Sequence, residues 1–184
     1  QLANGLALGA VYALIAIGYT MVYGVLRFIN FAHGDVFMLG SFAGFYVAPQ
    51  IGKFLPAPGW GGWLAVMISA MVICAIIGIV IERLAYRPLR NRPRLTVLIT
   101  AIGVSLFIEY TCQHKAVFGA SQQAFPKLLP TSTFNVGGLT FSSTQLVVLV
   151  VTAVLLAALT YVVKKTKIGM AMRAVSHNAA AASL

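Results

Sequence analysis

Acidic residues are scarce in this chain of 184 residues: only Asp35, Glu82 and Glu109 carry a carboxylate side chain. No pair of neighbouring carboxylates, no nucleophile elbow and no Walker loop occurs in the sequence. Acid–base catalysis would therefore depend on one of these three residues alone. The sequence therefore offers few candidate groups for catalysis.

Cysteine is nearly as rare, with only Cys74 and Cys112 present. The first lies in the middle of one apolar run and the second lies at the end of another. A disulfide needs Cα atoms within about 7 Å of each other, so we expect no bond between them. Their spacing does not match a metal site either, and we interpret both as packing residues.

Charged residues make up 9% of the chain, whereas hydrophobic residues make up 60% and the mean hydropathy is +0.91. These values lie outside the range of soluble globular domains and indicate an integral membrane protein. The formal net charge of +10 does not predict nucleic-acid binding, because the cations gather in short segments between apolar runs rather than on one basic face.

The apolar runs predict an all-α fold, a polytopic transmembrane helical bundle of about five spans. A span needs roughly 20 apolar residues, and no segment shows the alternation of a membrane β-barrel. The chain starts at Gln1 without a basic leader, and its last residues look like an unfinished pattern, so we expect an N-terminal fragment of a longer chain. The predicted spans are residues 6–25, 36–48, 63–81, 95–111 and 145–163.

The cations predict the orientation of this bundle. Excess Lys and Arg in short loops marks the cytoplasmic side, which places residues 82–94 in a basic cytoplasmic loop and residues 113–143 in an external loop. Of the 13 cations, only Lys53, Lys115 and Lys127 then remain outside. The N-terminus is also predicted to lie outside.

A polar segment, residues 27–35, separates the first two predicted spans. It reads RFINFAHGD, whereas no charged residue occurs in residues 2–26 or 36–52. The second span is short, so either its helix begins within the polar segment or the segment is a re-entrant turn. Polar groups next to lipid are energetically expensive, which makes this segment the first candidate site. Its candidate residues are Asn30, His33, Gly34 and Asp35.

Two interpretations of the polar segment remain open. Its side chains can satisfy backbone groups that a broken helix frees. Alternatively, the interrupted helix lines a water-filled path, and the polar residues orient a turn that meets the substrate or holds a gate.

The last stretch, residues 166–184, is too polar at its start to span a membrane and too rich in helix formers to be a plain loop. We predict a short cytoplasmic helix there. It is either an ordinary interfacial helix or a docking surface for a soluble partner.

The sequence closely resembles the permease subunits of the branched-chain amino acid ABC importers, specifically the shorter of their two paired permeases. The resemblance extends over essentially all 184 residues. The matching stretches are YALIAIGYTMVYG (residues 12–24), INFAHGD (29–35), ERLAYRPLR (82–90), AIG (101–103), Gly169, Arg173, Ala174, Asn178 and ASL (182–184).

The resemblance implies that residues 1–184 form one transmembrane permease domain in a bacterial plasma (inner) membrane. It also implies three kinds of partner: a second related permease, cytoplasmic ATP-binding subunits that bind and hydrolyse ATP, and an extracytoplasmic substrate-binding protein. This subunit then needs no cofactor of its own. The stretch with Gly169, Arg173, Ala174 and Asn178 is similar to the coupling helix that docks on the ATPase.

Two other functions fit the same pattern. One is a urea or short-chain amide permease of the same family. The other, from a different class, is a proton-coupled secondary carrier in which Asp35, His33 and Glu109 relay protons.

Overall fold

A computed structural model describes residues 2–26, 29–54, 59–89, 92–121, 123–136 and 139–177. These residues form six α-helices, two short helical turns of other kinds and a two-stranded hairpin. The chain divides into two compact units, Phe28–Pro130 on the one hand and Gln1–Arg27 with Thr131–Leu184 on the other. Each unit is described by itself.

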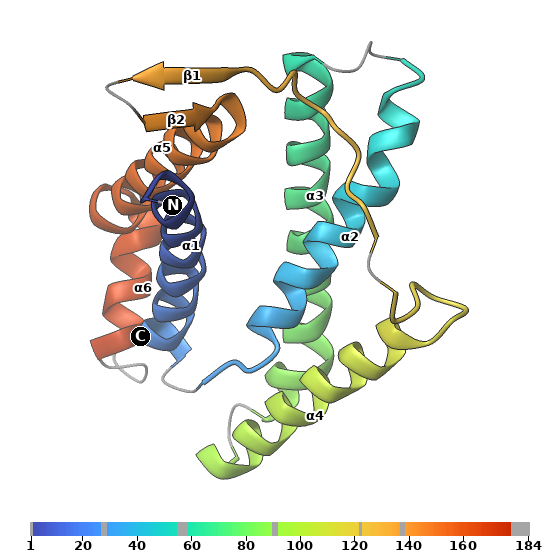
Figure 1. Ribbon diagram of the computed structural model, residues 1–184. Coiled ribbons are helices and arrows are strands. Elements are labelled where there is room, and N and C mark those ends of the chain that lie inside the picture. The colour runs from blue at the N-terminus through green and yellow to red at the C-terminus, as the bar shows by residue number, and fades with distance from the viewer. Residues whose placement is uncertain are drawn as a thin grey trace. The chain divides into compact units, whose positions relative to one another are not determined.

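The unit that contains both ends of the chain is a small helical bundle. Helix α1 (Leu2–Leu26) lies beside α5 (Ser143–Lys165), and α6 (Lys167–His177) packs against both of them (Figure 1). Strands β1 (Thr133–Val136) and β2 (Leu139–Ser142) pair antiparallel just before α5. Ser142 and Gln145 form a capping box that starts α5, which satisfies backbone N–H groups at the helix end.

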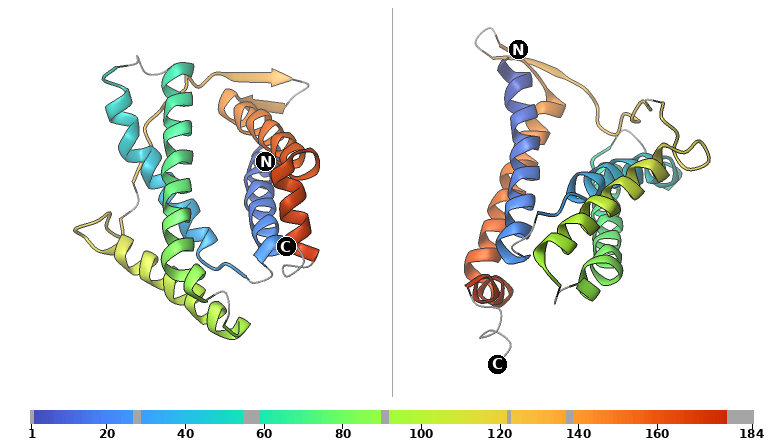
Figure 2. Two further views of the ribbon diagram at one scale, coloured as in Figure 1. Left: turned by 180° about the vertical axis from the view of Figure 1, so that it is seen from behind. Right: turned by 90° about the horizontal axis from the view of Figure 1, so that it is seen from below.

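The other unit is built on helices α2 (His33–Ile51) and α3 (Trp60–Ile81), which pack against each other. Helix α3 continues without a break into a π-helical turn, η1 (Glu82–Tyr86), and a 3₁₀ turn, η2 (Arg87–Leu89). Helix α4 (Arg94–Gln113) runs obliquely past η1 and also contacts α2 (Figure 1). The chain then returns along α2 as an extended segment (Figure 2).

The prediction of a polytopic helical membrane protein is confirmed. Among the described residues, four helical segments are long and apolar enough to cross a membrane: Asn4–Gly24, Trp60–Leu89, Leu95–Gln113 and Ser143–Lys165. Helix α2 contains the remaining predicted span. Its 19 residues would extend about 28 Å, and polar residues lie at both of its ends.

Two predicted loops have more regular structure than the sequence indicates. Residues 82–89, which include Pro88, are helical, whereas the concentration of basic residues led us to expect a loop over residues 82–94. Proline is compatible with the early positions of a helical turn, where no backbone donor is needed. The hairpin with register Thr133↔Ser142 to Val136↔Leu139 lies in the long polar loop predicted over residues 113–143.

The best-buried positions of the chain are small. Ala32 and Ala101 are both fully buried, whereas large side chains such as Phe107 (72% exposed) and Leu84 (77% exposed) face outward. Small residues let helices approach closely in lipid. An apolar exterior over small internal contacts is the pattern that a bilayer favours.

Candidate functional site: a polar clamp at the start of helix α2

The polar segment forms the turn that starts α2. Among its described residues, Asn30 accepts a hydrogen bond at its carbonyl oxygen from the backbone N–H of His33 (3.2 Å), and the carbonyl of Ala32 accepts one from Val36 (3.0 Å). Helix α2 therefore begins inside the polar segment, which is one of the two arrangements predicted. Arg27 lies outside the described residues.

Asp35 connects this first turn to α4. The hydroxyl of Ser105 donates a 2.5 Å hydrogen bond to Oδ2 of Asp35, whose side chain is half-buried. Hydrogen bonds to a carboxylate are stronger than those between neutral groups. The position of Asp35 in the first turn of α2 also places its negative charge at the favourable, positive end of the helix dipole.

Asn30 connects the same turn to the end of α3. Tyr86 in η1 donates its hydroxyl proton to Oδ1 of Asn30, over 2.6 Å, and the Tyr86 side chain is buried, with 6% exposure. A π-helical turn is wider than an α-helical turn and changes the face on which later residues lie. We therefore attribute the inward direction of Tyr86 to η1.

Asn30, Asp35, Tyr86 and Ser105 together form what we call the polar clamp. Two hydrogen bonds join α2 to two elements that lie 56 and 70 positions further along the chain. On α4, Val97 and Ala101 are buried and precede Ser105 at intervals of four, so the three residues share one face of the helix. That face is the one turned towards the clamp.

The other two predicted residues contribute less. His33 is half-buried and takes part in the turn through its backbone N–H. Gly34 is helical and exposed, and a Cβ atom placed on it would meet nothing within 4 Å. Gly34 lies within the first turn of α2.

The sequence did not single out the two donors of the clamp. Tyr86 appeared only as part of the basic stretch, and Ser105 looked like an ordinary hydroxyl in an apolar span. The available signal was the four-residue spacing of Val97, Ala101 and Ser105, which puts a hydroxyl on the most buried stripe of its helix. Within the described parts of the chain, no three His, Cys, Asp or Glu side chains gather as a metal site would require.

The second predicted site lies at the junction of α5 and α6. Thr166 links the two helices, because its hydroxyl donates to the carbonyl of Val162 (2.6 Å) and accepts from the backbone N–H of Gly169 (3.2 Å). Gly169 is buried, and a Cβ atom on it would collide with the backbone carbonyls of Val162 and Val163. Glycine at this position allows the close approach of the two helices.

Helix α6 turns several side chains outward. Ile168 and Met170 are more than half exposed, and Arg173 and Ala174 are exposed as well. Asn178, the remaining predicted coupling residue, lies outside the described residues.

Comparison with known proteins places the sequence in one family. Residues 1–184 match the family described as "Branched-chain amino acid transport system / permease component". The high-affinity branched-chain amino acid transport system permease protein LivH of Escherichia coli (strain K12) is 39% identical over 189 residues, which cover 100% of this chain and 60% of LivH. The corresponding protein BraD of Pseudomonas aeruginosa is 38% identical over 178 residues, covering 95% of this chain and 57% of BraD.

A more distant relative is the probable branched-chain amino acid transport permease protein LivH of Methanocaldococcus jannaschii, which is 31% identical over 173 residues, or 90% of this chain and 50% of the relative. No solved structure matches the chain. The chain spans at most about 60% of the length of these relatives. Since the family pattern extends over all of residues 1–184, this chain belongs to the family of branched-chain amino acid transport system permease components.

Proposed function

We propose that this chain forms part of the membrane permease of an ATP-driven importer of branched-chain amino acids in a bacterial plasma membrane. The observation that carries the proposal is the family match over residues 1–184, together with relatives whose names specify high-affinity transport of these amino acids. The several apolar helices that could cross a membrane are compatible with such a role.

The partners in this proposal are a second related permease, cytoplasmic ATP-binding subunits and an extracytoplasmic substrate-binding protein. ATP is bound and hydrolysed by the ATP-binding subunits, and this chain supplies a docking helix for them. Support for α6 as that helix comes from its exposed Ile168, Met170 and Arg173. Met170 and Arg173 are three positions apart and share one face of α6, whereas Ile168 lies on another face. Met and Arg are both enriched at protein interfaces.

The junction at Thr166 supports transmission of force from α6. Its two hydrogen bonds and the tight packing of Gly169 against α5 attach α6 firmly to the end of α5. Helix α6 also contacts α1. A displacement of α6 by an ATPase would therefore move α1 and α5 together with it.

Transport then follows alternating access, in which ATP binding favours one of two conformations of the bundle. In this mechanism the polar clamp keeps the start of α2 attached to α4 and η1 while conformations exchange. The bond from Ser105 to Asp35 supports a structural role for Asp35 rather than a proton relay. A relay would also need a path to Glu109, which is exposed and accepts a 3.2 Å hydrogen bond from Gln113 on its own helix.

The direct test is uptake of labelled leucine and labelled urea by proteoliposomes that contain the full-length protein with its partner subunits. ATP is withheld in one series, and a protonophore is added with ATP present in another. We expect leucine uptake that needs ATP and survives the protonophore. If urea rather than leucine is taken up, again with ATP required and the protonophore without effect, the transporter is a urea importer. If the protonophore abolishes leucine uptake, a proton-coupled carrier is favoured.

The docking role of α6 has a separate test in Arg173→Glu and Ala174→Asp. Each reverses or adds charge on an exposed face, so the protein should reach the membrane and the ATPase should still turn over, but with less leucine transported per ATP hydrolysed. Arg173→Lys keeps the charge and serves as the matched control with near-normal coupling. An unchanged ratio of leucine to ATP in both acidic variants would exclude the docking role.

A further inference from the structure

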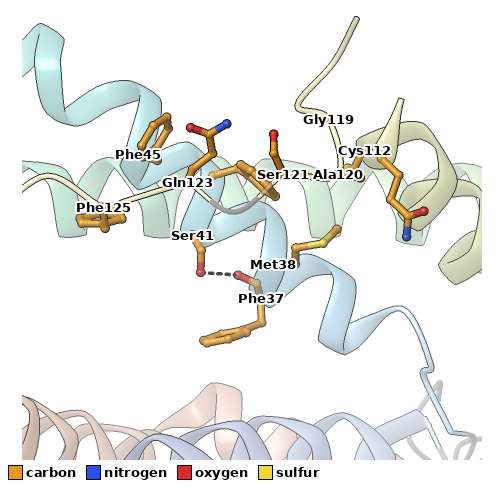
Figure 3. A pocket seen from close by; sticks show the side chains of 12 residues that line it. Phe37, Met38, Ser41, Phe45, Cys112, Gly119, Ala120, Ser121, Gln123 and Phe125 are labelled. Atoms are coloured by element: carbon orange, nitrogen blue, oxygen red, sulfur yellow. Dashed lines mark hydrogen bonds between the residues drawn. The ribbon is translucent and has the colours of Figure 1, made fainter. Parts of the chain in front are cut away.

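An open cavity of about 500 Å³ lies between α2 and the end of α4 with the segment that follows it. Its apolar lining comes largely from one stripe of α2 and from the returning segment (Figure 3). The volume is in the range of small-molecule sites, roughly 300–1,000 Å³. The main apolar residues are Phe37, Met38, Phe42, Phe45 and Phe125.

Ring contacts hold the returning segment against α2 at this cavity. Phe42 stacks on Phe118 with ring centroids 4.3 Å apart and an interplanar angle of 5°. Phe45 lies 6.4 Å from Phe125, again between ring centroids. Gly119 turns the segment with a φ of 80°, a conformation that favours glycine, and its N–H bonds the carbonyl of His114. The walls are thus defined by specific contacts.

The remaining lining is polar without being charged. It includes the hydroxyls of Ser41 and Ser121 and the amides of Gln113 and Gln123, all on exposed side chains. Hydroxyl and amide groups can both donate and accept hydrogen bonds. They can therefore bind an ammonium and a carboxylate at once, as a zwitterion with no net charge requires.

We infer that this cavity is a transient binding site for a branched-chain amino acid. The aliphatic side chain lies among the phenylalanine rings, and the zwitterionic end meets the amides and hydroxyls. The inference rests on the proposed function and adds a location for the substrate. A polar side chain among these rings would lose its hydrogen bonds to water, which is unfavourable, so the site would favour leucine, isoleucine and valine over polar amino acids.

The lining argues against a phospholipid as the occupant. An anionic headgroup is bound by clusters of Lys and Arg, and the lining residues include neither. An acyl chain alone could not form hydrogen bonds with the two amides and two hydroxyls. It would place these polar groups in apolar surroundings, which is unfavourable.

The test is photolabelling with a leucine analogue that carries a diazirine in its side chain. The complete transporter in proteoliposomes is illuminated during ATP-driven turnover, and adducts are located by mass spectrometry. We expect adducts within residues 37–45 or 119–125 that excess leucine removes and excess glutamate does not. Ser121→Trp should fill the cavity and lower this labelling at least tenfold. Phe54→Trp, at a residue that is 86% exposed and outside the cavity, should leave it unchanged.

Wild-type leucine uptake, measured in the same vesicles, separates this inference from the proposed function. Absence of leucine uptake would overturn the proposed function. Normal uptake with adducts only elsewhere, or with adducts that excess leucine does not remove, would overturn the cavity as a substrate site. A diazirine-bearing phospholipid that labels these residues, with the leucine analogue failing to do so, would assign the cavity to lipid instead.

Discussion

Ser105, in the middle of α4, donates a hydrogen bond to Asp35, in the first turn of α2, across 70 positions of sequence. The pair joins a carboxylate at a helix N-terminus to a hydroxyl on the buried stripe of another helix. Tyr86 holds Asn30, five residues before Asp35, in a similar way. The turn at the start of α2 is therefore hydrogen-bonded to both η1 and α4.

Ser105→Ala should lower the stability of the full-length protein by about 1–2 kcal/mol. Hydrogen bonds to charged groups contribute about 1.5–3 kcal/mol in soluble proteins, whereas polar pairs in membrane proteins average about 0.6 and reach about 1.7 kcal/mol. Thermal unfolding in detergent measures the change.

Thr100→Ala is the matched control for Ser105→Ala, because the Thr100 hydroxyl bonds only the carbonyl of Thr96 on its own helix (2.9 Å). We expect little change from it. Asp35→Ala combined with Ser105→Ala should destabilise by less than the sum of the two single variants, since each single change already removes the same interaction. Strict additivity would mean that the pair makes no energetic contribution.

Tyr86→Phe should destabilise the same unit by about 0.5–1 kcal/mol, because it removes one neutral hydrogen bond and keeps the buried ring. Asn30→Ala should have a larger effect, since it removes both the Oδ1 acceptor of this bond and the packing of the Asn30 side chain beside the buried Tyr86. Tyr110→Phe provides the control, at a tyrosine that is 68% exposed. Equal unfolding temperatures for Tyr86→Phe and Tyr110→Phe would contradict a structural role for the Asn30–Tyr86 bond.

The helical class and the presence of a polar segment between two apolar spans could be predicted from the sequence, because both follow from local properties. Apolar length predicts spans, and Asp35 between uncharged runs is conspicuous. The partners Ser105 and Tyr86 could not be predicted, because their roles depend on how α4 and η1 approach α2. Residues 82–89 were also not predicted as helical, because the basic residues there gave a signal for a loop and Pro88 is tolerated early in a helical turn.

The roles of two glycines also could not be distinguished from the sequence. Gly34 and Gly169 both looked functional in the sequence, yet Gly34 has open space around it and Gly169 has none. Only the position of a neighbouring backbone distinguishes them. Gly169, for which a coupling role is predicted, is therefore also required for close packing against α5, and this requirement cannot be read from a single sequence.

Gly40→Ala tests the close approach of α2 and α3. A Cβ atom on Gly40 would lie 2.7 Å from Sγ of Cys74, with no other contact within 4 Å. Alanine is the better helix former by about 1 kcal/mol, so the sign of the effect depends on the sulfur. We expect Gly40→Ala to lower the unfolding temperature of the wild type but to raise that of Cys74→Ala.

Gly78→Ala is the control for this pair, because a Cβ atom on Gly78 would meet nothing within 4 Å. It should stabilise the protein equally in both backgrounds. If Gly40→Ala likewise had the same effect with and without Cys74, the contact between α2 and α3 would not be as close as the structure has it.

Gly169→Ala should destabilise the protein by at least about 2 kcal/mol, near the upper part of the range for overpacking, because the added methyl group meets backbone atoms of α5 that cannot rotate away. The same change should reduce leucine transported per ATP hydrolysed, since α6 would tilt away from α5. Gly34→Ala, with open space around it, is the matched control. It should leave the coupling close to wild type and should not lower the stability. If Gly169→Ala has normal stability but transports less leucine per ATP, the methyl group disturbs the ATPase contact and not the junction. If both quantities are normal, the junction at Thr166 accommodates a side chain.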